Sequence, residues 1–219
     1  MAIDHNDVNA GAAIYSRQVL AIYDLSMLIF FKFVWQCPTI HVLELYNDNI
    51  SSNHLDVGVG SGYYLDQCQF PSDNPNILLL DLNHNSLSAA ARRISRYRPE
   101  MLQANALEPI LLKNTFDSVG LGSLLHCLPG TIKDKAVIFE NLRPLMNPGG
   151  VIFGCTLING GVSKHWFARQ AMQRLNAKKI FCNLQDNADD LQEALSKRFF
   201  DSNVRIIGCM ALFTARTPV

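Results

Sequence analysis

The stretch HLDVGVGSGYYLD, from His54 to Asp66, limits the possible folds of this chain more than any other feature. An apolar strand ends at Asp56, and Gly58, Gly60 and Gly62 follow at alternate positions before a helical segment. Glycines let the backbone turn sharply and come close to a ligand, and the N-terminus of a helix offers free N–H groups. The stretch therefore predicts a strand–turn–helix unit with a ligand at its turn.

Apolar runs and helical segments alternate along the rest of the chain. Strands are predicted at His54–Val57, Ile77–Asp81, Phe116–Leu121, Val151–Thr156, Val204–Ile207 and Met210–Ala215. Helices are predicted from a cap at Asn85 to a stop at Pro99, after the capping-box pair Thr131 and Asp134, around Ala168–Leu175 and at Ala188–Phe199, with a turn at Asn147–Gly150. This order indicates one α/β domain whose mainly parallel sheet ends in an antiparallel hairpin.

Composition narrows the class of protein further. The 219 residues suit a single domain, and 19 basic residues balance 19 acidic ones. Proteins that bind nucleic acid through its phosphates carry a basic excess, so no nucleic-acid partner is expected. The six cysteines lack the paired spacing of a zinc site, and buried, inert thiols are expected. The N-terminus does not read as a signal peptide, which favours a cytoplasmic protein.

One apolar stretch, Val19 to Trp35, could suggest a membrane helix. Asp24 and Lys32 interrupt it, and its longest uncharged piece is shorter than the roughly 20 residues of a spanning helix. We therefore predict no membrane span. A helix that is buried against the domain or covers an apolar pocket explains the stretch better.

A second polar position lies at the end of the next strand. Asp81 comes 23 residues after Gly58, where a carboxylate can accept hydrogen bonds from both hydroxyls of a ribose. The alternative is an aspartate that caps the following helix. A nicotinamide oxidoreductase is disfavoured, because the dinucleotide fingerprint needs a glycine where this chain has Tyr63.

Five segments in order, DVGVGSG, LLLDLN, QANALEP, FDSVGLGSLLHCLPG and LRPLMNPGGVIFG, resemble the successive motifs of class I S-adenosylmethionine-dependent methyltransferases. The likeness is greatest to the compact "type 11/type 12" enzymes that act on small molecules. It runs from His54 to Gly154 and more loosely to the C-terminus. The resemblance implies a Rossmann-like fold, S-adenosylmethionine as cofactor and a small-molecule methyl acceptor as partner.

The resemblance also implies roles for single residues. Asp56 is expected to order the loop and the amino end of the cofactor, Gly58–Gly62 with Val59 to line its methionine part, and Asp81 to hold the ribose. Leu82 is expected on the adenine, with Asn105 and Ala106 at the edge of the adenine ring. Asn105 replaces the usual Asp of the family but keeps an acceptor oxygen. Leu121, Gly122 and Tyr23 complete the expected cofactor site.

No metal is expected, because the fourth strand runs into Gly-Leu-Gly-Ser rather than the acidic metal ligand of catechol-type enzymes. His126 follows that strand and is the candidate general base for a hydroxyl acceptor. Its alternative is a histidine packed under the loop. His165, Tyr15 and Tyr23 are weaker candidates for the base.

Two segments are candidates for a lid. Leu25–Trp35 is apolar almost all round, and a surface helix needs only one apolar face. With the helix at Trp166–Leu175, it could cover an apolar acceptor pocket beside Gly122 and His126, or it could pack on the sheet or on a second subunit of a homodimer. Within one domain of residues 1–219, we expect an N-terminal helical cap (1–50), a cofactor-binding core (51–156), and a lid helix with closing strands (157–219).

Two other functions share this pattern. A fold-mate could bind the same cofactor and catalyse a non-methylating step such as a cyclisation, since fold does not fix function. A silent partner subunit would have no need of the glycine loop and Asp81. Methylation of a small, fairly apolar metabolite is the function that the sequence favours.

Overall fold

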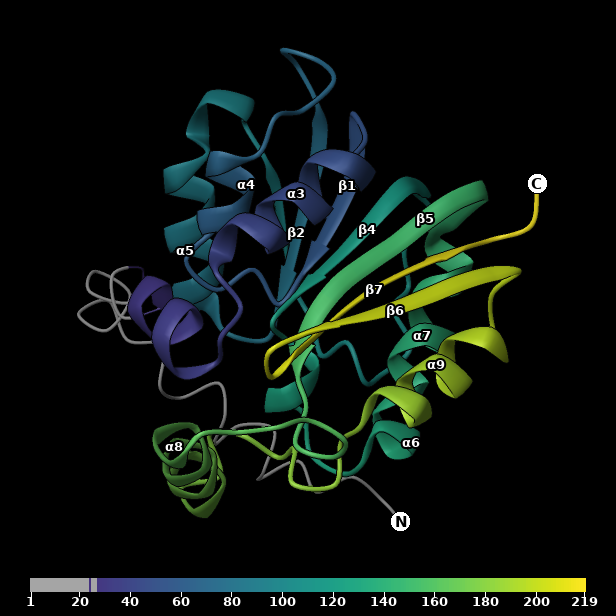
Figure 1. The fold of residues 1–219 in the computed structure, drawn as a ribbon. Coiled ribbons are helices and arrows are strands. Elements are labelled where there is room, and N and C mark those ends of the chain that lie inside the picture. Colours follow the sequence, from purple (N-terminus) through teal and green to yellow (C-terminus); the bar gives the residue numbers. More distant parts are fainter. Residues whose placement is uncertain (1–23, 25–26) are drawn as a thin grey trace.

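The computed structural model describes Asp24 and residues 27–219 of the chain. Its centre is a seven-stranded sheet in the order β3-β2-β1-β4-β5-β7-β6 (Figure 1). The strands are β1 Asn53–Val57, β2 Asn76–Asp81, β3 Glu100–Gln103, β4 Phe116–Gly122, β5 Met146–Leu157, β6 Asp201–Ile207 and β7 Met210–Arg216. The first five are parallel, and β7 runs antiparallel to both β5 and β6. The predicted α/β domain with its antiparallel C-terminal pair is confirmed.

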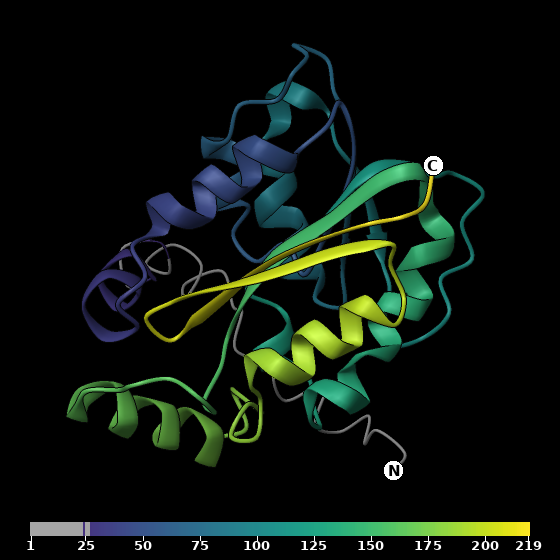
Figure 2. The same ribbon diagram turned by 45° about the vertical axis from the view of Figure 1, so that its right-hand side comes forward.

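Helices cover both faces of the sheet (Figures 1 and 2). One face carries α3 Thr39–Asn49, α4 Tyr63–Gln67 and α5 His84–Arg93, and the other carries α6 Ile132–Lys135, α7 Val137–Leu142 and α9 Ala188–Ser196. Apolar side chains alternate along the strands, so each face has its own core: Leu55 faces α6, α7 and α9, whereas Leu79 faces the other group. Helix α8, Trp166–Ala177, lies beyond the carboxyl ends of the parallel strands.

The strand order reverses between β1 and β4, which are neighbours in the sheet but not in the chain. Connections from these two strands leave toward opposite faces, so the loops after them separate and leave a crevice. In open α/β sheets ligands bind at this point, outside the carboxyl ends of the strands. The topology thus places the glycine loop after β1 and the end of β4 on two sides of one crevice.

Several boundaries differ from the sequence prediction. The cap of α5 is Asn83 rather than Asn85, because Asn83 Oδ1 accepts the backbone N–H of Asn85 at 2.8 Å. This helix already ends at Arg93, and the short 3₁₀ turn η2 Ser95–Tyr97 leads on toward Pro99. Strand β3 was not predicted, since an edge strand with one neighbour and mostly exposed side chains carries no apolar run.

The remaining segments follow the predicted pattern more closely. Thr131 and Asp134 form the predicted capping box at the start of α6. The Asn147–Gly150 turn is instead an irregular start of β5, whose register against β4 shifts between Phe116 and Ser118. The last predicted helix ends at Ser196. Two further 3₁₀ turns, η3 Leu125–Cys127 and η4 Arg143–Leu145, complete the described elements.

The apolar N-terminal segment lies only partly within the described residues. From Met27 the chain is helical, Phe30–Val34 forms the π-helical turn η1, and the chain then turns into α3. Among the described residues, no single helix has both the length and the apolarity of a membrane span. Met27–Val34 and Thr39–Asn49 meet that test only when counted together, across a bend of 107°.

Candidate active site

The three glycines of the loop after β1 have two different roles. All three have a positive φ, which L-residues with a side chain rarely adopt. A Cβ on Gly58 would lie 2.7 Å from the side chain of Leu124, and one on Gly62 would lie 2.9 Å from the Cα atom of Ala90 in α5. A Cβ on Gly60 would meet nothing within 4 Å. Only Gly60 therefore leaves open space for a ligand, whereas Gly58 and Gly62 make room for protein atoms.

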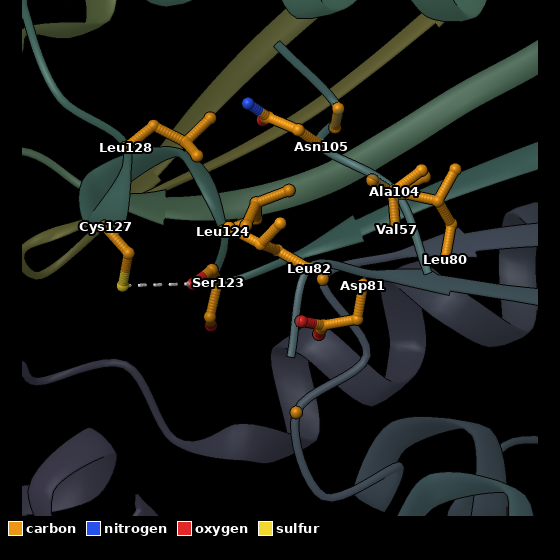
Figure 3. Close-up of a pocket in the computed structure, with 13 residues that line it drawn as sticks. Val57, Leu80, Asp81, Leu82, Ala104, Asn105, Ser123, Leu124, Cys127 and Leu128 are labelled. Atoms are coloured by element: carbon orange, nitrogen blue, oxygen red, sulfur yellow. Dashed lines mark hydrogen bonds between the residues drawn. The ribbon is translucent and has the colours of Figure 1, made fainter. Parts of the chain in front are cut away.

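A cavity opens in front of this loop at the carboxyl ends of β1, β2 and β4 (Figure 3). The space in front of the loop measures about 690 Å³, a figure that includes open solvent at the mouth. Six of the residues expected at the cofactor line it: Gly58, Gly60, Asp81, Leu82, Asn105 and Ala106. The crevice predicted by the topology is thus a pocket with one carboxylate, one amide and mostly apolar walls.

Asp81 is the acidic group of this cavity. Its Oδ1 accepts the backbone N–H of Asn83 at 2.8 Å, and Figure 3 shows its carboxylate at the end of β2 on the side of the glycine loop. Burial raises the pKa of Asp81 to about 6, while the backbone N–H groups of Asn83, Gly60 and Val59 act in the opposite direction. A carboxylate so placed gains from additional hydrogen-bond donors, because they stabilise its charged form.

Asn105 lies at the opposite end of the cavity, after β3. Its Oδ1 accepts the backbone N–H of Leu107 at 3.1 Å, and its Nδ2 donates to Glu108 Oε1 at 2.9 Å. These two bonds fix the orientation of the amide. A carbonyl oxygen has two lone pairs, so Asn105 Oδ1 keeps one for a ligand. Ala106 follows directly and is held by Asn141 Nδ2, which donates to its carbonyl at 3.1 Å.

Five other residues expected at the cofactor do not line this cavity. They are Asp56, Val59, Gly62, Leu121 and Gly122. Val59 and Leu121 are buried among the apolar side chains on opposite faces of the sheet. Tyr23, also expected there, and Tyr15 lie outside the described residues.

Asp56 belongs to a buried polar network behind the loop. Tyr46 Oη donates to Asp56 Oδ2 at 3.0 Å, and His54 Nε2 lies 3.4 Å from the same oxygen. The other ring nitrogen of His54 is 2.8 Å from Ser118 Oγ. Gly122 serves this network, since a Cβ there would lie 2.6 Å from the Tyr46 hydroxyl. The network holds β1, β4 and α3 together directly beneath the glycine loop.

Seven residues of the cavity wall were not predicted, and four of them come from one segment: Ser123, Leu124, Cys127 and Leu128. All four lie just after β4, where the sequence pointed instead to His126. Ser123 has a φ of +63°, a strained conformation for a residue with a side chain. Burial raises the pKa of Cys127 to about 12, so its thiol stays protonated. The sequence signal that could have identified these residues is their position directly after a strand. Their residue types do not indicate a binding site.

His126 lies behind the cavity wall rather than in it. Its side chain is buried, and its Nδ1 accepts the backbone N–H of Leu157 at 3.2 Å. The ring of Phe181 lies against it, with 4.5 Å between ring centroids. Burial, together with the charge of Lys135, lowers the pKa of His126 to about 3. In the neutral ring that this implies, Nε2 carries the proton, a geometry that fits the packing alternative.

The two segments considered for a lid meet at the carboxyl ends of the strands. His165 Nε2 lies 3.1 Å from the carbonyl oxygen of Phe33, which joins the start of α8 to η1. Trp35 lies 6.3 Å from Phe181 between ring centroids, and Phe181 in turn contacts His126. Neither segment contributes a wall to the cavity of Figure 3.

The N-terminal segment also reaches the glycine loop. Asp24 Oδ1 accepts the hydroxyl of Ser61 at 2.7 Å, and Asp24 Oδ2 forms an ion pair with Arg93 of α5. Arg93 also donates to the carbonyl of Ser61 at 3.1 Å. This three-residue contact fixes the start of the described chain beside Gly60 and Gly62.

The described part of the chain contains neither a metal-binding cluster nor a disulfide. No cluster of three His, Cys, Asp or Glu side chains is present there that could hold a metal ion. None of the six cysteines, which all lie in this part of the chain, forms a disulfide: four are buried and two, Cys127 and Cys182, are half-buried.

Known proteins are similar to this chain in sequence and in fold. A family model described as a methyltransferase domain matches residues 55–152. Demethylluteothin O-methyltransferase of Streptomyces thioluteus is 39% identical over 212 residues, covering 94% of this chain and 91% of the relative. N-methyltransferase vrtF of Penicillium aethiopicum is 37% identical over 186 residues, 84% of this chain and 78% of the relative. The solved complex of DhpI with SAH has a TM-score of 0.71 over 98% of each chain, at 16% identity.

The match to the curated relatives extends far beyond the glycine loop, over nearly the whole chain. Together with the cavity at the strand ends and the sheet order, it establishes the family. This chain belongs to the class I S-adenosylmethionine-dependent methyltransferases and methylates a small molecule.

Proposed function

We propose that the cavity between Gly60, Asp81 and Asn105 binds the adenosine part of S-adenosylmethionine. The observation that carries this proposal is the pairing of two features in one cavity: the open space at Gly60 and the buried carboxylate of Asp81. Asp81 accepts hydrogen bonds from the ribose hydroxyls, and Asn105 Oδ1 with the Ala106 N–H contacts the adenine edge. Leu82 packs on the adenine ring.

The other residues expected at the cofactor support the site without lining the cavity. Asp56 is held by Tyr46 and His54, and it stabilises the loop that carries Gly58, Val59 and Gly62 from behind. Gly122 leaves room for the Tyr46 hydroxyl, and Leu121 packs on the opposite face. The cofactor supplies an electrophilic methyl group on a sulfonium, and the protein's own contribution is to position and desolvate the acceptor.

The acceptor of this proposal is a small, neutral, apolar molecule that carries a hydroxyl group. Support for a hydroxyl acceptor comes from the relative named as an O-methyltransferase. Residues 27–35 of the N-terminal cap and α8 form the lid of this site, above a cofactor-binding core at 51–156. The Asp24–Arg93–Ser61 contact fixes the cap to the loop.

Methylation of paired acceptors tests this function. We expect a neutral phenol to be methylated at least about tenfold faster than the same phenol carrying a carboxylate, because burial of an unpaired charge is costly. The matching aniline shows whether nitrogen is also methylated. Product mass spectrometry with a trideuteromethyl-labelled cofactor measures all three. Preference for the charged phenol contradicts the apolar acceptor, and preference for the aniline contradicts the hydroxyl acceptor.

His126 can be tested by two substitutions. In His126→Asn the amide oxygen can still accept the Leu157 N–H, whereas in His126→Leu that buried N–H has no partner and stability falls by about 1–3 kcal/mol. If His126 packs under the loop, His126→Asn keeps kcat within about threefold of wild type, since no proton-transfer group is lost. Thermal melting and steady-state kinetics at saturating cofactor measure both effects. A loss of kcat of about 100-fold or more in a well-folded His126→Asn protein instead identifies the general base.

A further inference from the structure

Two stretches of this chain contain basic residues but no acidic ones. Residues 27–43 and 159–185 contain six lysines and arginines and no aspartate or glutamate: Lys32, Lys164, Arg169, Arg174, Lys178 and Lys179. The whole chain carries 19 residues of each sign. These stretches include η1 and α8, which both views place at the same end of the molecule (Figures 1 and 2). In a chain of balanced charge, these two stretches are therefore locally basic.

Large aromatic side chains protrude at the same end. Phe33 is 64% exposed, Trp166 is 62% exposed and Phe167 is 68% exposed. The His165 ring joins them, because its Nε2 lies 3.1 Å from the Phe33 carbonyl and its centroid 6.3 Å from that of Phe167. Trp166 and Phe167 lie 4.8 Å apart between ring centroids. Phe33, Trp166 and Phe167, with Lys32 and Arg169, form what we call the aromatic tip.

The basic groups of the aromatic tip lie beside its rings. Lys32 Nζ is 5.2 Å from the centroid of the Phe33 ring, and Arg169 is exposed one helical turn after Trp166. Exposed apolar groups beside cations complement a surface that is anionic outside and apolar just beneath. Side chains exposed by more than three-fifths also stand out from the protein instead of lining a groove. A partner that is fluid, such as a lipid surface, can accommodate protruding side chains without having a complementary shape.

We propose that the aromatic tip binds the surface of an anionic lipid bilayer, with its rings inserted among the headgroups and Lys32 and Arg169 at the lipid phosphates. This inference concerns contact with a membrane surface and needs no spanning helix. It is independent of the proposed acceptor, because vesicle binding requires neither cofactor nor catalysis. For the enzyme, it would place the carboxyl ends of the strands, where the acceptor is expected, toward a source of apolar molecules.

Sedimentation with vesicles tests the proposal, using the purified full-length protein. We expect binding to phosphatidylcholine vesicles that contain roughly 30% phosphatidylglycerol, and at least about tenfold weaker binding to phosphatidylcholine alone. Tryptophan emission gives a second reading, since Trp35 is 2% exposed and Trp166 is the exposed one of the two tryptophans. Insertion of Trp166 shifts the emission to the blue when anionic vesicles are added.

Matched variants separate the contribution of the aromatic rings from that of the basic side chains. Trp166→Ser/Phe167→Ser and, separately, Lys32→Glu/Arg169→Glu should each reduce vesicle binding at least about tenfold. Phe200→Ser and Lys113→Glu alter an exposed phenylalanine and an exposed lysine elsewhere and should bind as wild type does. Melting temperatures confirm that each variant is folded.

Three results overturn the proposal. The first is wild-type protein that stays in solution with both kinds of vesicle. The second is binding that the Trp166→Ser/Phe167→Ser pair leaves unchanged, which shows charge attraction without insertion. The third is a wild-type dimer in analytical ultracentrifugation that this pair converts to a monomer while vesicles bind neither protein, which makes the tip an interface between two copies of the chain.

Discussion

Asp81→Ala should weaken the binding of S-adenosylhomocysteine by about 2–4 kcal/mol, or roughly 30- to 1,000-fold. Asp81 is the carboxylate of the cavity, and the substitution removes a charged acceptor for two ribose hydroxyls. The backbone N–H of Asn83 also loses a partner, so the melting temperature of the variant is measured as well. Calorimetric titration of the variant and the wild type measures the difference.

Asp73→Ala is the matched control, because Asp73 is exposed in the loop before β2 and away from the cavity. It should bind the cofactor as wild type does. An Asp81→Ala protein that melts normally and keeps wild-type affinity would remove Asp81 from the ribose site.

The pH dependence of cofactor binding gives an independent reading of the same residue. The pKa of Asp81 is about 6 in the free protein because burial disfavours the charged form. Ribose hydroxyls donate to the ionised carboxylate, so binding favours that form and releases a proton. Affinity should therefore be nearly full at pH 7 and above, and it should fall about tenfold between pH 7 and pH 5. Asp81→Asn removes the titrating group and should give a flat profile over this range.

Gly60→Val should abolish cofactor binding, with a loss of affinity of at least about 100-fold, or about 2.7 kcal/mol. Gly60 lines the cavity, and a Cβ there meets no protein atom within 4 Å, so the valine side chain occupies space that the ligand needs. The φ of +51° adds roughly 1–2 kcal/mol of strain for a residue with a Cβ, which the fold can tolerate. Thermal melting with and without S-adenosylhomocysteine measures both effects.

A second glycine offers a close control for this strain. Gly161 also has a positive φ, +73°, and a Cβ on it meets nothing within 4 Å, but it lies in the loop after β5 and away from the cavity. Gly161→Val should therefore lose similar stability and keep the cofactor-induced rise in melting temperature. If Gly60→Val also keeps that rise, the ligand does not pass close to Gly60.

Local sequence signals were sufficient to predict most of the architecture. Parallel strands that are buried on both faces need apolar runs, and the runs of the four such strands were all visible in the chain. The fifth parallel strand, β3, is an edge strand whose side chains are mostly exposed, so it lacks the signal that burial imposes. Glycine spacing and the acid at the end of β2 were likewise local, and they predicted which loop and which strand end form the cavity.

What the sequence could not supply was the environment of each side chain. Gly58, Gly60 and Gly62 look alike in the chain, but only their distances from Leu124 and Ala90 show that Gly60 alone is open. Residue type likewise singled out His126 after β4, but its side chain faces Leu157 instead of the cavity. The cavity wall in this segment is formed by its neighbours Ser123, Leu124, Cys127 and Leu128.

The two kinds of property differ in how far apart in the chain the residues lie that determine them. Strand, turn and helix depend on neighbours within a few residues, which the sequence shows directly. Burial, pKa and the space beside a Cβ depend on atoms brought from distant segments, such as Leu157 against His126 and Tyr46 against Gly122. The sequence by itself determined the parallel sheet and the place of the site, and only the tertiary structure decided which side chains face the cavity.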